Sequence, residues 1–572
     1  MANGDRKPWL KLYPEEIPAR LDYEERPLFH FLQQAAIKHP DKTAVDFLGK
    51  ELSYAELYES AVKVAHFFHS LGIQKGERVS VMLPNCPQGV ISYYGVLLAG
   101  GIVVQTNPLY TERELHHQLA DSEARFIICL DLVYPKVLKV MSSLKLEHVI
   151  VTGIQDFLPF PKNVLYPLVQ RKQKKSLLVD VNYRHPFVHS FPSILEHTEA
   201  IQPEIDVDPK EDLALLQYTG GTTGPAKGVM LTHYNLVANT MQCRAWMYKM
   251  KYGEERVLGI LPFFHVYGMT TVMNLSVMYA AEMIILPRFD VKQTLKTIEK
   301  KHPTLFPGAP TMYIGLLHHP DIEKYDLSSI NACISGSAPL PAEVQKQFQE
   351  KTNGRLVEGY GLSEASPVTH ANLIWNDRKT GSIGLPFPDT DAACLSLETG
   401  EIAGVNEVGE LMVKGPQVMK GYWRRPDETA AVFKDEWLLT GDVGYMDEDG
   451  YFYIIDRKKD MIIAGGFNIY PREVEEVLYE HEAVQEVVVV GVPDAYRGET
   501  VKAYVVLKKG KTCGEKELDD HCRQSLAAFK VPHLYEFRDE LPKTTVGKIL
   551  RRTLLEEEKK KAQAAAGESQ SN

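Results

Sequence analysis

A glycine- and threonine-rich stretch, YTGGTTGPAKG at residues 218–228, contains residue types that bind phosphate. Glycines allow backbone N–H groups to approach phosphate oxygens closely, threonine hydroxyls donate hydrogen bonds, and a lysine supplies positive charge. The stretch is not a Walker A loop, because GxxxxGK[ST] cannot be aligned on it. On its own it would equally suit an ordinary surface loop. The residues that could contact phosphate are Thr219, Gly220, Gly221, Thr222, Thr223, Gly224 and Lys227.

Seven further segments follow in the chain, and most of them contain glycine, hydroxyl-bearing or charged residues. They are LPFFHVYG (261–268), SGSAPL (335–340), EGYGLSEASP (358–367), GYWRRPDET (421–429), WLLTGDVG (437–444), YIIDRKKDMIIAGGFNIYPREVE (453–475) and LPKTTVGKILRR (541–552). Together with 218–228, the series resembles the adenylate-forming superfamily of acyl-CoA synthetases, firefly-type luciferases and nonribosomal-peptide adenylation domains, over roughly residues 25–555. It looks closest to bacterial long-chain fatty-acid–CoA ligases.

The resemblance implies a ligation in two steps. A carboxylate attacks the α-phosphorus of ATP and expels pyrophosphate, which gives an acyl adenylate, and a thiol then displaces AMP. The first step needs Mg²⁺, charge neutralisation and positioning more than covalent work by the protein. We therefore expect ATP, Mg²⁺ and coenzyme A, with free coenzyme A as the acceptor because no carrier domain follows residue 555.

The resemblance also implies how individual residues meet the nucleotide. The stretch 218–228 would contact the β- and γ-phosphates, with Thr219 among the catalytic residues. Glu364 would hold Mg²⁺, and Ser363, where the family more often has threonine, would hydrogen-bond the α-phosphate. Asp442 would bind the ribose hydroxyls, reinforced by Arg457. Tyr360 and the backbone of Gly336, Ser337 and Ala338 would form the walls around the adenine. Gly359 and Gly361, on either side of Tyr360, are also expected to bind the nucleotide.

Further expected roles concern the catalytic lysine and the second step. Lys548 would reach from a small domain to bridge the carboxylate and the α-phosphate in the transition state. Lys459 matches the hinge about which that domain rotates, after which Gly465 and Gly466 would lie against the pantetheine arm. His265 is assigned a positioning or gating role beside the substrate carboxylate, although a lone histidine among apolar residues is more often a packed core residue.

The acid itself is indicated only by the expected pocket. Its segments, 263–266, 269–273, 308–312 and 335–337, are apolar or small and hold no charge to pair with a polar acid, which favours a fatty acyl chain of undetermined length. The alternatives are an aryl- or coumarate-type acid–CoA ligase, a luciferase-like oxygenase and a catalytically silent lipid-binding protein of the same fold. Intact Lys227, Glu364, Asp442 and Lys548 argue against the silent protein.

Composition limits the partners. A net charge of −11 and a pI near 6.0 argue against nucleic acid. Seven scattered cysteines suit a reducing, cytoplasmic compartment, and no apolar run is long enough to span a bilayer. Residues 157–175 join an apolar run to four basic residues, which predicts either a solvated surface loop or a peripheral contact with the inner face of the membrane. A homodimer is left open.

Short β-rich runs alternate with helical patterns over the first two thirds of the chain, at 78–83, 102–107, 125–130, 148–153 and 282–286. This alternation predicts an α/β fold with largely parallel, buried sheets. From residue 381 the pattern becomes β-rich, with a hairpin signal at 447–450. We expect a large N-terminal domain, 1–455, of α/β subdomains plus this β-rich subdomain. A small mobile α+β domain, 456–572, would follow and end in a frayed tail at 556–572.

Overall fold

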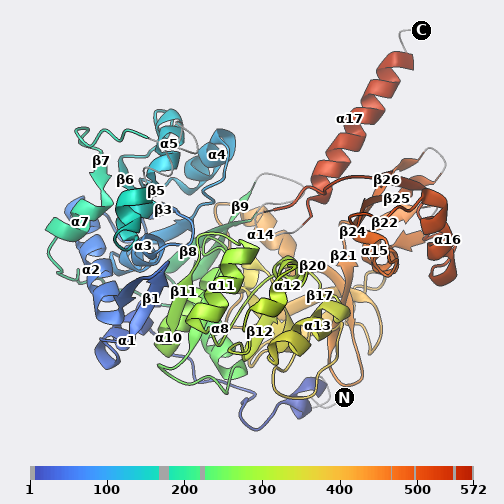
Figure 1. Cartoon of the computed structure of the whole chain (residues 1–572), viewed down its shortest axis with the longest axis horizontal. Helices are drawn as coiled ribbons and strands as arrows, with labels where there is room; N and C mark the ends of the chain where they lie inside the picture. The colour runs from blue at the N-terminus through green and yellow to red at the C-terminus, as the bar shows by residue number, and fades with distance from the viewer. Residues whose placement is uncertain are drawn as a thin grey trace. The chain divides into compact units, whose positions relative to one another are not determined.

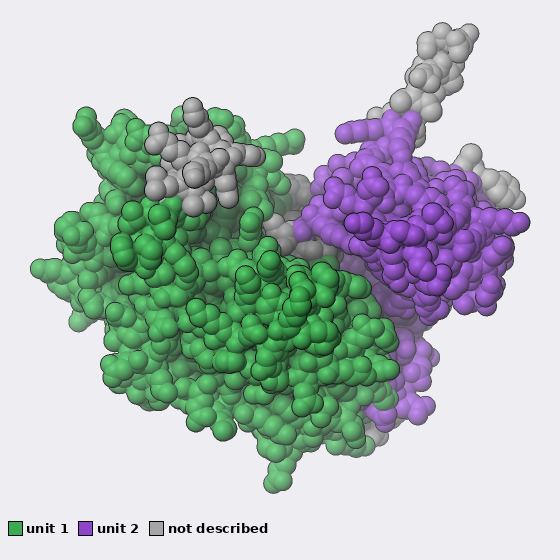
Figure 2. Space-filling model, viewed as in Figure 1, with its two compact units in different colours: residues 1–391, 413–438 green, residues 392–412, 439–572 purple. Residues whose placement is uncertain are grey.

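The computed structural model describes residues 7–166, 179–219, 226–464, 467–494, 497–544 and 549–569 (Figure 1). The chain forms two compact units (Figure 2): unit 1 is residues 1–391 and 413–438, and unit 2 is residues 392–412 and 439–572. The sequence-based boundary at 455/456 falls inside unit 2, within β21 (Phe452–Arg457), because this strand pairs with β20 (Trp437–Met446). Within the described ranges, no helix has the length and apolarity needed to cross a membrane.

An eight-stranded sheet in unit 1 carries both ends of the glycine-rich stretch. Its order is β18-β9-β8-β4-β3-β5-β6-β7, parallel from β8 to β7 and antiparallel at β8–β9 and β9–β18. Its strands are β3 (Arg78–Met82), β4 (Ile102–Gln105), β5 (Phe126–Leu130), β6 (His148–Thr152), β7 (Val188–Ser190), β8 (Leu213–Thr219), β9 (Lys227–Thr232) and β18 (Gly421–Tyr422). All five residues of β5 are buried, as expected where helices cover both faces of a parallel sheet.

Helices connect and cover these strands. α3 (Pro87–Leu98) is buried along its length and ends just before Gly100, which has a φ of 74° that suits glycine. α4 (Glu112–Ser122) and α5 (Tyr134–Met141) pack against β5 and β6. Further helices of unit 1 include α1 (His30–Lys38), α2 (Tyr54–Ser70), α7 (Phe191–His197), α8 (His233–Trp246), α10 (Leu275–Tyr279) and α14 (Pro426–Val432). The predicted alternation of strands and helices is confirmed.

Two four-stranded sheets complete the α/β part of unit 1, with the orders β10-β11-β1-β2 and β12-β13-β14-β15. Their strands are β1 (Thr43–Phe47), β2 (Lys50–Ser53), β10 (Arg256–Gly259), β11 (Glu282–Ile285), β12 (Ala332–Ser335), β13 (Arg355–Gly361), β14 (Val368–Ala371) and β15 (Leu385–Pro386). One buried core joins them to α11 (Val291–Lys301), α12 (Pro310–Leu317) and α13 (Ala342–Thr352).

A five-stranded sheet forms the β-rich part, in the order β16-β17-β20-β19 with β21 on β20. The strands not yet given are β16 (Asp391–Leu395), β17 (Gly409–Lys414) and β19 (Phe433–Lys434). The turn between β20 and β21 is closed by a hydrogen bond of 2.9 Å from the Asp447 amide to the Tyr451 carbonyl oxygen. The hairpin predicted at 447–450 is therefore confirmed.

The C-terminal part of unit 2 is a sheet between two helical layers. The sheet has the order β23-β22-β25-β24, with β26 parallel to β25. Alternate valines of β24 face opposite sides: Val487 and Val489 pack under α15 and α16, whereas Val488 and Val490 pack with Leu554 of α17. The elements are β22 (Ile462–Ala464), β23 (Phe467–Ile469), α15 (Pro471–Tyr479), β24 (Val484–Asp494), β25 (Gly498–Leu507), α16 (Glu515–Ser525), β26 (Leu534–Phe537) and α17 (Arg551–Ser569).

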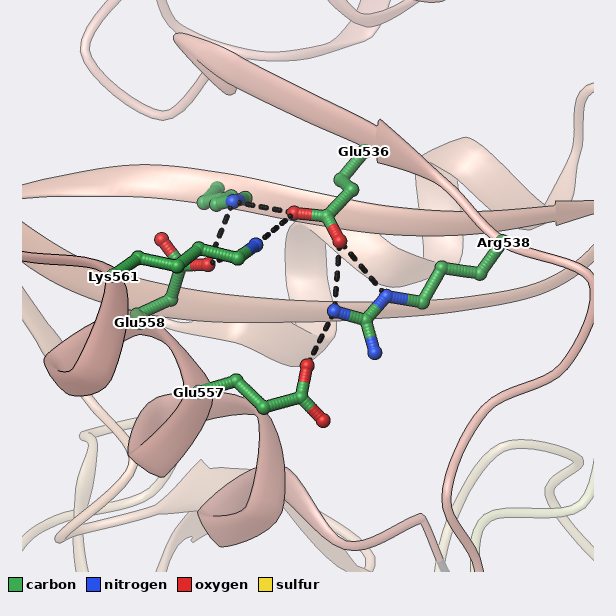
Figure 3. Close-up of polar contacts among 6 residues, drawn as sticks. Glu536, Arg538, Glu557, Glu558 and Lys561 are labelled. Carbon is green, nitrogen blue, oxygen red and sulfur yellow. Dashed lines mark hydrogen bonds and ion pairs between the residues drawn. The ribbon is translucent and has the colours of Figure 1, made fainter. Parts of the chain in front are cut away.

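A network of three cations and three carboxylates fastens α17 to this sheet (Figure 3). Glu536 accepts from Lys502 at 2.8 Å, from Lys561 at 2.9 Å and from Arg538 at 2.7 Å. Two carboxylates of α17 complete the network, since Glu557 lies 2.5 Å from Arg538 and Glu558 lies 3.0 Å from Lys502. The helix therefore continues past residue 556, where the sequence predicts fraying, because packing and ion pairs anchor its first turns.

This network should make the attachment of α17 depend on pH. Burial opposes ionisation of Glu536, but hydrogen bonds from Lys502, Lys561 and Arg538 outweigh it and lower the pKa of Glu536 to about 2. Because an unfolded glutamate titrates near ~4.3, the charged carboxylate stabilises the fold above that pH and loses this effect as the pH falls toward ~2.

Glu536→Gln should therefore weaken amide protection of α17 by about 1–2 kcal/mol at pH 7, and the deficit should shrink below pH ~4.3 and be nearly lost near pH ~2. Hydrogen exchange followed by mass spectrometry measures this difference at each pH. Glu540→Gln, an exposed neighbour, is the control. An equal deficit at pH 3 and pH 7 would show that the charge of Glu536 has no part in it.

Candidate functional site

The two ends of the glycine-rich stretch face each other on neighbouring strands. Thr219 ends β8 and Lys227 begins β9, and the two are paired across the antiparallel ladder. The stretch therefore connects two strands of a hairpin and does not lead from a strand into a helix. The intervening candidates Gly220, Gly221, Thr222, Thr223 and Gly224 lie outside the described residues.

Lys227 is linked through a tyrosine to the predicted magnesium carboxylate. Its ammonium group pairs with Glu428 and lies 4.9 Å from the ring centre of Tyr422. The Tyr422 hydroxyl donates to Glu364 at 2.8 Å. Burial and the adjacent Glu364 carboxylate raise the pKa of Tyr422, so its hydroxyl stays protonated and can hold that carboxylate in place. Lys227, at one end of the glycine-rich stretch, and the Glu364 carboxylate are therefore connected through Tyr422.

A second set of contacts fixes the same strands from the side. Asp121, at the end of α4, accepts from the Tyr218 hydroxyl at 2.7 Å and from Arg425 at 3.2 Å. The Trp423 amide donates to the Gly228 carbonyl oxygen at 2.7 Å, which adds β18 beside β9. These bonds hold the segment that carries Tyr422 and Glu428 against the base of the glycine-rich stretch.

The two segments expected around adenine end neighbouring parallel strands. β12 and β13 pair in register up to Ser335 and Glu358, so residues 336–338 leave the sheet beside residues 359–361, which are the last three of β13 and pair with β14. Ser337 has a φ of 72°, and the Tyr360 ring lies 5.9 Å from that of buried His370. A side chain at Gly361 would collide with the Pro367 carbonyl oxygen, so only glycine fits there. Ser363 and Glu364 follow in a short 3-10 helix.

The segments expected to form the acyl pocket are brought together around Tyr267. Its hydroxyl lies 2.7 Å from the Ile334 carbonyl oxygen and 3.2 Å from that of Gly308. Residues Met269–Asn274, which the sequence marks only as apolar, form a π-helix, a rare conformation often found at functional sites. His265 packs on Phe264, and burial lowers the pKa of His265 to about 4, so its imidazole is neutral at physiological pH.

In unit 2 the predicted ribose carboxylate is already paired with its predicted partner. Asp442 and Arg457 are opposite one another on β20 and β21, and the Arg457 Nε lies 2.9 Å from a carboxylate oxygen of Asp442. Asp442 is almost fully buried, at 4% exposed. Lys459 follows in an exposed turn, and Gly465 and Gly466 lie outside the described residues.

Lys548 also lies outside the described residues, but both ends of its segment are described. Lys543 and Ile549 form an antiparallel bridge, and the Leu550 amide donates to the Pro542 carbonyl oxygen at 2.8 Å. The next residue, Arg551, is held by Glu475 at 2.5 Å. The chain thus leaves and returns at a fixed place on unit 2.

Sequence reasoning missed several residues of these groups. Tyr422 and Glu428 lie in the segment GYWRRPDET, which the resemblance includes, but nothing in that segment shows that it runs beside β9. Asp121 carried no signal that could distinguish it from a surface charge. Arg551 lies in the segment LPKTTVGKILRR, but nothing there separates it from Arg552, because its partners are distant in the chain.

Comparison with known proteins defines the class. The AMP-binding enzyme family matches residues 32–423, and the AMP-binding enzyme C-terminal domain matches residues 473–548. A long-chain-fatty-acid–CoA ligase of Bacillus subtilis (strain 168) is 62% identical over 556 residues, 97% of this chain and 98% of that protein. The corresponding ligase of Salmonella typhimurium is 40% identical over 560 residues, 96% and 98% of the two chains. The chain therefore belongs to the AMP-binding enzyme family.

Solved structures agree with this assignment. ATP-bound MatB from Rhodopseudomonas palustris superposes with a TM-score of 0.81 at 30% identity, over 93% of this chain and 99% of that chain. A fatty acyl CoA synthetase of Mycobacterium tuberculosis gives a TM-score of 0.71 at 28% identity, over 94% and 99%. The predicted adenylate-forming fold, with a large N-terminal part and a small C-terminal part, is confirmed.

Proposed function

We propose that this chain is an ATP-dependent long-chain fatty acid–CoA ligase that forms AMP. The observation that supports this proposal most strongly is the 62% identity of this chain to a long-chain-fatty-acid–CoA ligase over nearly the whole of both chains. The fatty acid carboxylate attacks the α-phosphorus of ATP, and the bond to pyrophosphate breaks. The thiol of coenzyme A then attacks the acyl carbonyl, loses its proton, and AMP leaves.

The residues of unit 1 supply the phosphate end of this scheme. Thr219, Lys227 and the stretch between them bind the β- and γ-phosphates, and Ser363 donates to the α-phosphate. Glu364 suits Mg²⁺, because a carboxylate oxygen is a ligand that this hard cation prefers and the Tyr422 hydroxyl orients it. When bound, Mg²⁺ neutralises phosphate charge. The Glu428 partner keeps Lys227 extended near the loop base until phosphate replaces it.

The residues of unit 2 supply the ribose and catalytic groups. Asp442 accepts from the ribose hydroxyls while Arg457 holds its carboxylate, Lys548 stabilises the transition state of adenylation, and Lys459 is the hinge between the two half-reactions. Replacing Lys459 with proline should spare adenylation and slow thioester formation, because proline restricts the backbone rotation that a hinge requires.

Asp442→Asn should raise the KM for ATP about tenfold to a hundredfold, the equivalent of ~1.5–3 kcal/mol for hydrogen bonds to a charged group. The change keeps the shape of the side chain but removes the charge that binds the ribose and pairs with Arg457. ATP-dependent pyrophosphate exchange measures the KM. Glu448→Gln, exposed on the same hairpin, should leave it unchanged; an unaltered KM in Asp442→Asn would remove the ribose assignment.

The acid is best tested by AMP release with coenzyme A across a graded panel of fatty and aromatic acids. Long-chain fatty acids should give the highest kcat/KM. A preference for aromatic acids would support the alternative that a 35% identical relative, described as a probable 4-coumarate–CoA ligase of Dictyostelium discoideum, exemplifies. No AMP with any acid would support a catalytically silent lipid-binding protein.

We further propose that the reaction takes place in the cytoplasm, with peripheral contact between residues 157–175 and anionic lipid. Three apolar side chains in the described part of this segment are exposed: Phe160 at 82%, Val164 at 59% and Leu165 at 49%. Exposed apolar groups next to basic residues suit an interface where the substrate itself dissolves. The basic residues 171–175 lie outside the described residues.

Combined Phe160→Ser and Val164→Ser substitution should release the protein from anionic vesicles in a flotation assay, by about tenfold or more. Ile37→Ser, which removes an equally exposed apolar side chain elsewhere in unit 1, should not. Equal binding by all three proteins would contradict the contact. A homodimer is a separate prediction, and light scattering tests it by measuring the mass of the protein in solution.

A further inference from the structure

Two adjacent arginines at the start of α17 have very different surroundings. Arg552 is half exposed and pairs only one helical turn away, with Glu556 at 2.7 Å. Arg551 is mostly buried and reaches three separate parts of unit 2. It lies 2.5 Å from Glu475 of α15, 3.5 Å from Asp460 of the turn after β21, and 3.3 Å from the Val489 carbonyl oxygen of β24.

The acceptors around Arg551 are themselves fixed. Glu475 also accepts from the Val489 amide at 2.7 Å, so the guanidinium, the carboxylate and β24 form a closed set of hydrogen bonds. Burying a guanidinium stabilises little unless such partners compensate its desolvation, and losing a partner then costs far more than losing a surface pair. A solvated lysine at this position would avoid the desolvation cost of a buried guanidinium. The buried arginine therefore points to a role that needs a planar cation able to bind several acceptors at once.

Arg551 is close in the chain or in space to two segments of unit 2 that have expected roles in the ligation. Arg551 is three residues beyond Lys548, so it fixes where that segment rejoins the fold. Asp460 is the residue after Lys459. On the other side of Lys459, Lys458 is held separately, by Glu410 at 2.8 Å and by the Gly441 carbonyl oxygen, which accepts from its amide at 2.9 Å. Lys459 therefore lies between two anchored neighbours.

We propose that Arg551 is a positioning residue for the ligation: it ties the turn that follows Lys459 to the point at which the chain rejoins unit 2 after Lys548. When the backbone turns at Lys459, Asp460 and Arg551 then move together, so the rotation also displaces the point from which Lys548 is presented. This inference rests on the proposed function and adds to it a residue that touches neither nucleotide nor acid.

The test compares four variants of the full chain. Arg551→Met and Asp460→Asn should lower kcat of pyrophosphate exchange about a hundredfold and tenfold, with the KM values for ATP and fatty acid within threefold of the parent. Arg551→Lys, which keeps the charge but not the fork, should be intermediate. Arg552→Met should match the parent. Because Arg551 and Asp460 act through one link, the double variant Arg551→Met, Asp460→Asn should be no slower than Arg551→Met alone.

The outcomes separate this inference from the proposed function. A parent protein that releases no AMP overturns the proposed function. A parent that is active, with Arg551→Met equally active, overturns the positioning role alone. A purely structural role would give higher KM values and additive effects in the double variant, and that pattern also overturns the inference.

Discussion

Replacing Lys548 with alanine is expected to abolish pyrophosphate exchange, by at least ~10³-fold, while thioester formation from supplied acyl adenylate persists. The reason is that only adenylation brings two anions together, the carboxylate and the α-phosphate, and builds further negative charge on the α-phosphate oxygens as the bond to pyrophosphate breaks. A lysine placed between them stabilises that transition state far more than the ground state. In the second step the acyl adenylate has already formed, so the Lys548 ammonium group contributes little to the transition state of thioester formation.

The two half-reactions are measured separately, by exchange of labelled pyrophosphate into ATP and by coenzyme A thioester formed from synthetic acyl adenylate. Lys559→Ala, which removes an exposed lysine of α17, is the matched control and should leave both rates intact. Equal loss of both half-reactions in Lys548→Ala would mean that the lysine supports the fold of its segment or binds the nucleotide throughout.

Glu364→Gln should have the next largest effect, a fall of about 10²- to 10³-fold in kcat for adenylation together with a higher Mg²⁺ requirement. A neutral amide is a poor ligand for a hard divalent cation, and several kcal/mol of charge stabilisation depend on that cation. The fold should be retained, because the amide oxygen can still accept from the Tyr422 hydroxyl as the carboxylate does at 2.8 Å.

Tyr422→Phe tests the orienting hydroxyl of Tyr422 separately from the proposed metal ligand Glu364. Loss of the hydroxyl should cost only about tenfold in kcat, since the carboxylate survives but is less well held. Pyrophosphate exchange measured across a range of Mg²⁺ concentrations distinguishes the two variants, and exposed Glu343→Gln is the control. A Glu364→Gln protein with the parental Mg²⁺ dependence would show that the metal is held elsewhere.

Much of the fold was predictable because the signals were local. Parallel strands buried on both faces must be continuous apolar runs, so β3, β4, β5 and β6 stand out in the sequence. The α15 helix begins at a proline and the β20–β21 turn contains an Asp-Gly pair, and each marks an element boundary directly. The resemblance then supplied roles for residues that lie in its motifs.

The contacts that join the motifs were not predictable. The bond between Tyr422 and Glu364 spans 58 residues, that between Tyr218 and Asp121 spans 97, and that between Arg551 and Glu475 spans 76. No periodicity links such positions, since the pairing depends on which strands become neighbours. The π-helix at Met269–Asn274 was equally hidden, because its residues are those of any buried helix.

The order of the two units along the chain limits how relatives of this protein can be recombined. Residues 392–412 belong to unit 2 and residues 413–438 return to unit 1, so the polypeptide passes between the units three times. A chimera joined once at residue 456 would not exchange one unit for another. It would pair Asp442 of one parent with Arg457 of the other across the β20–β21 ladder. Such hybrids should tolerate divergent surfaces but require parents whose hairpin residues are matched.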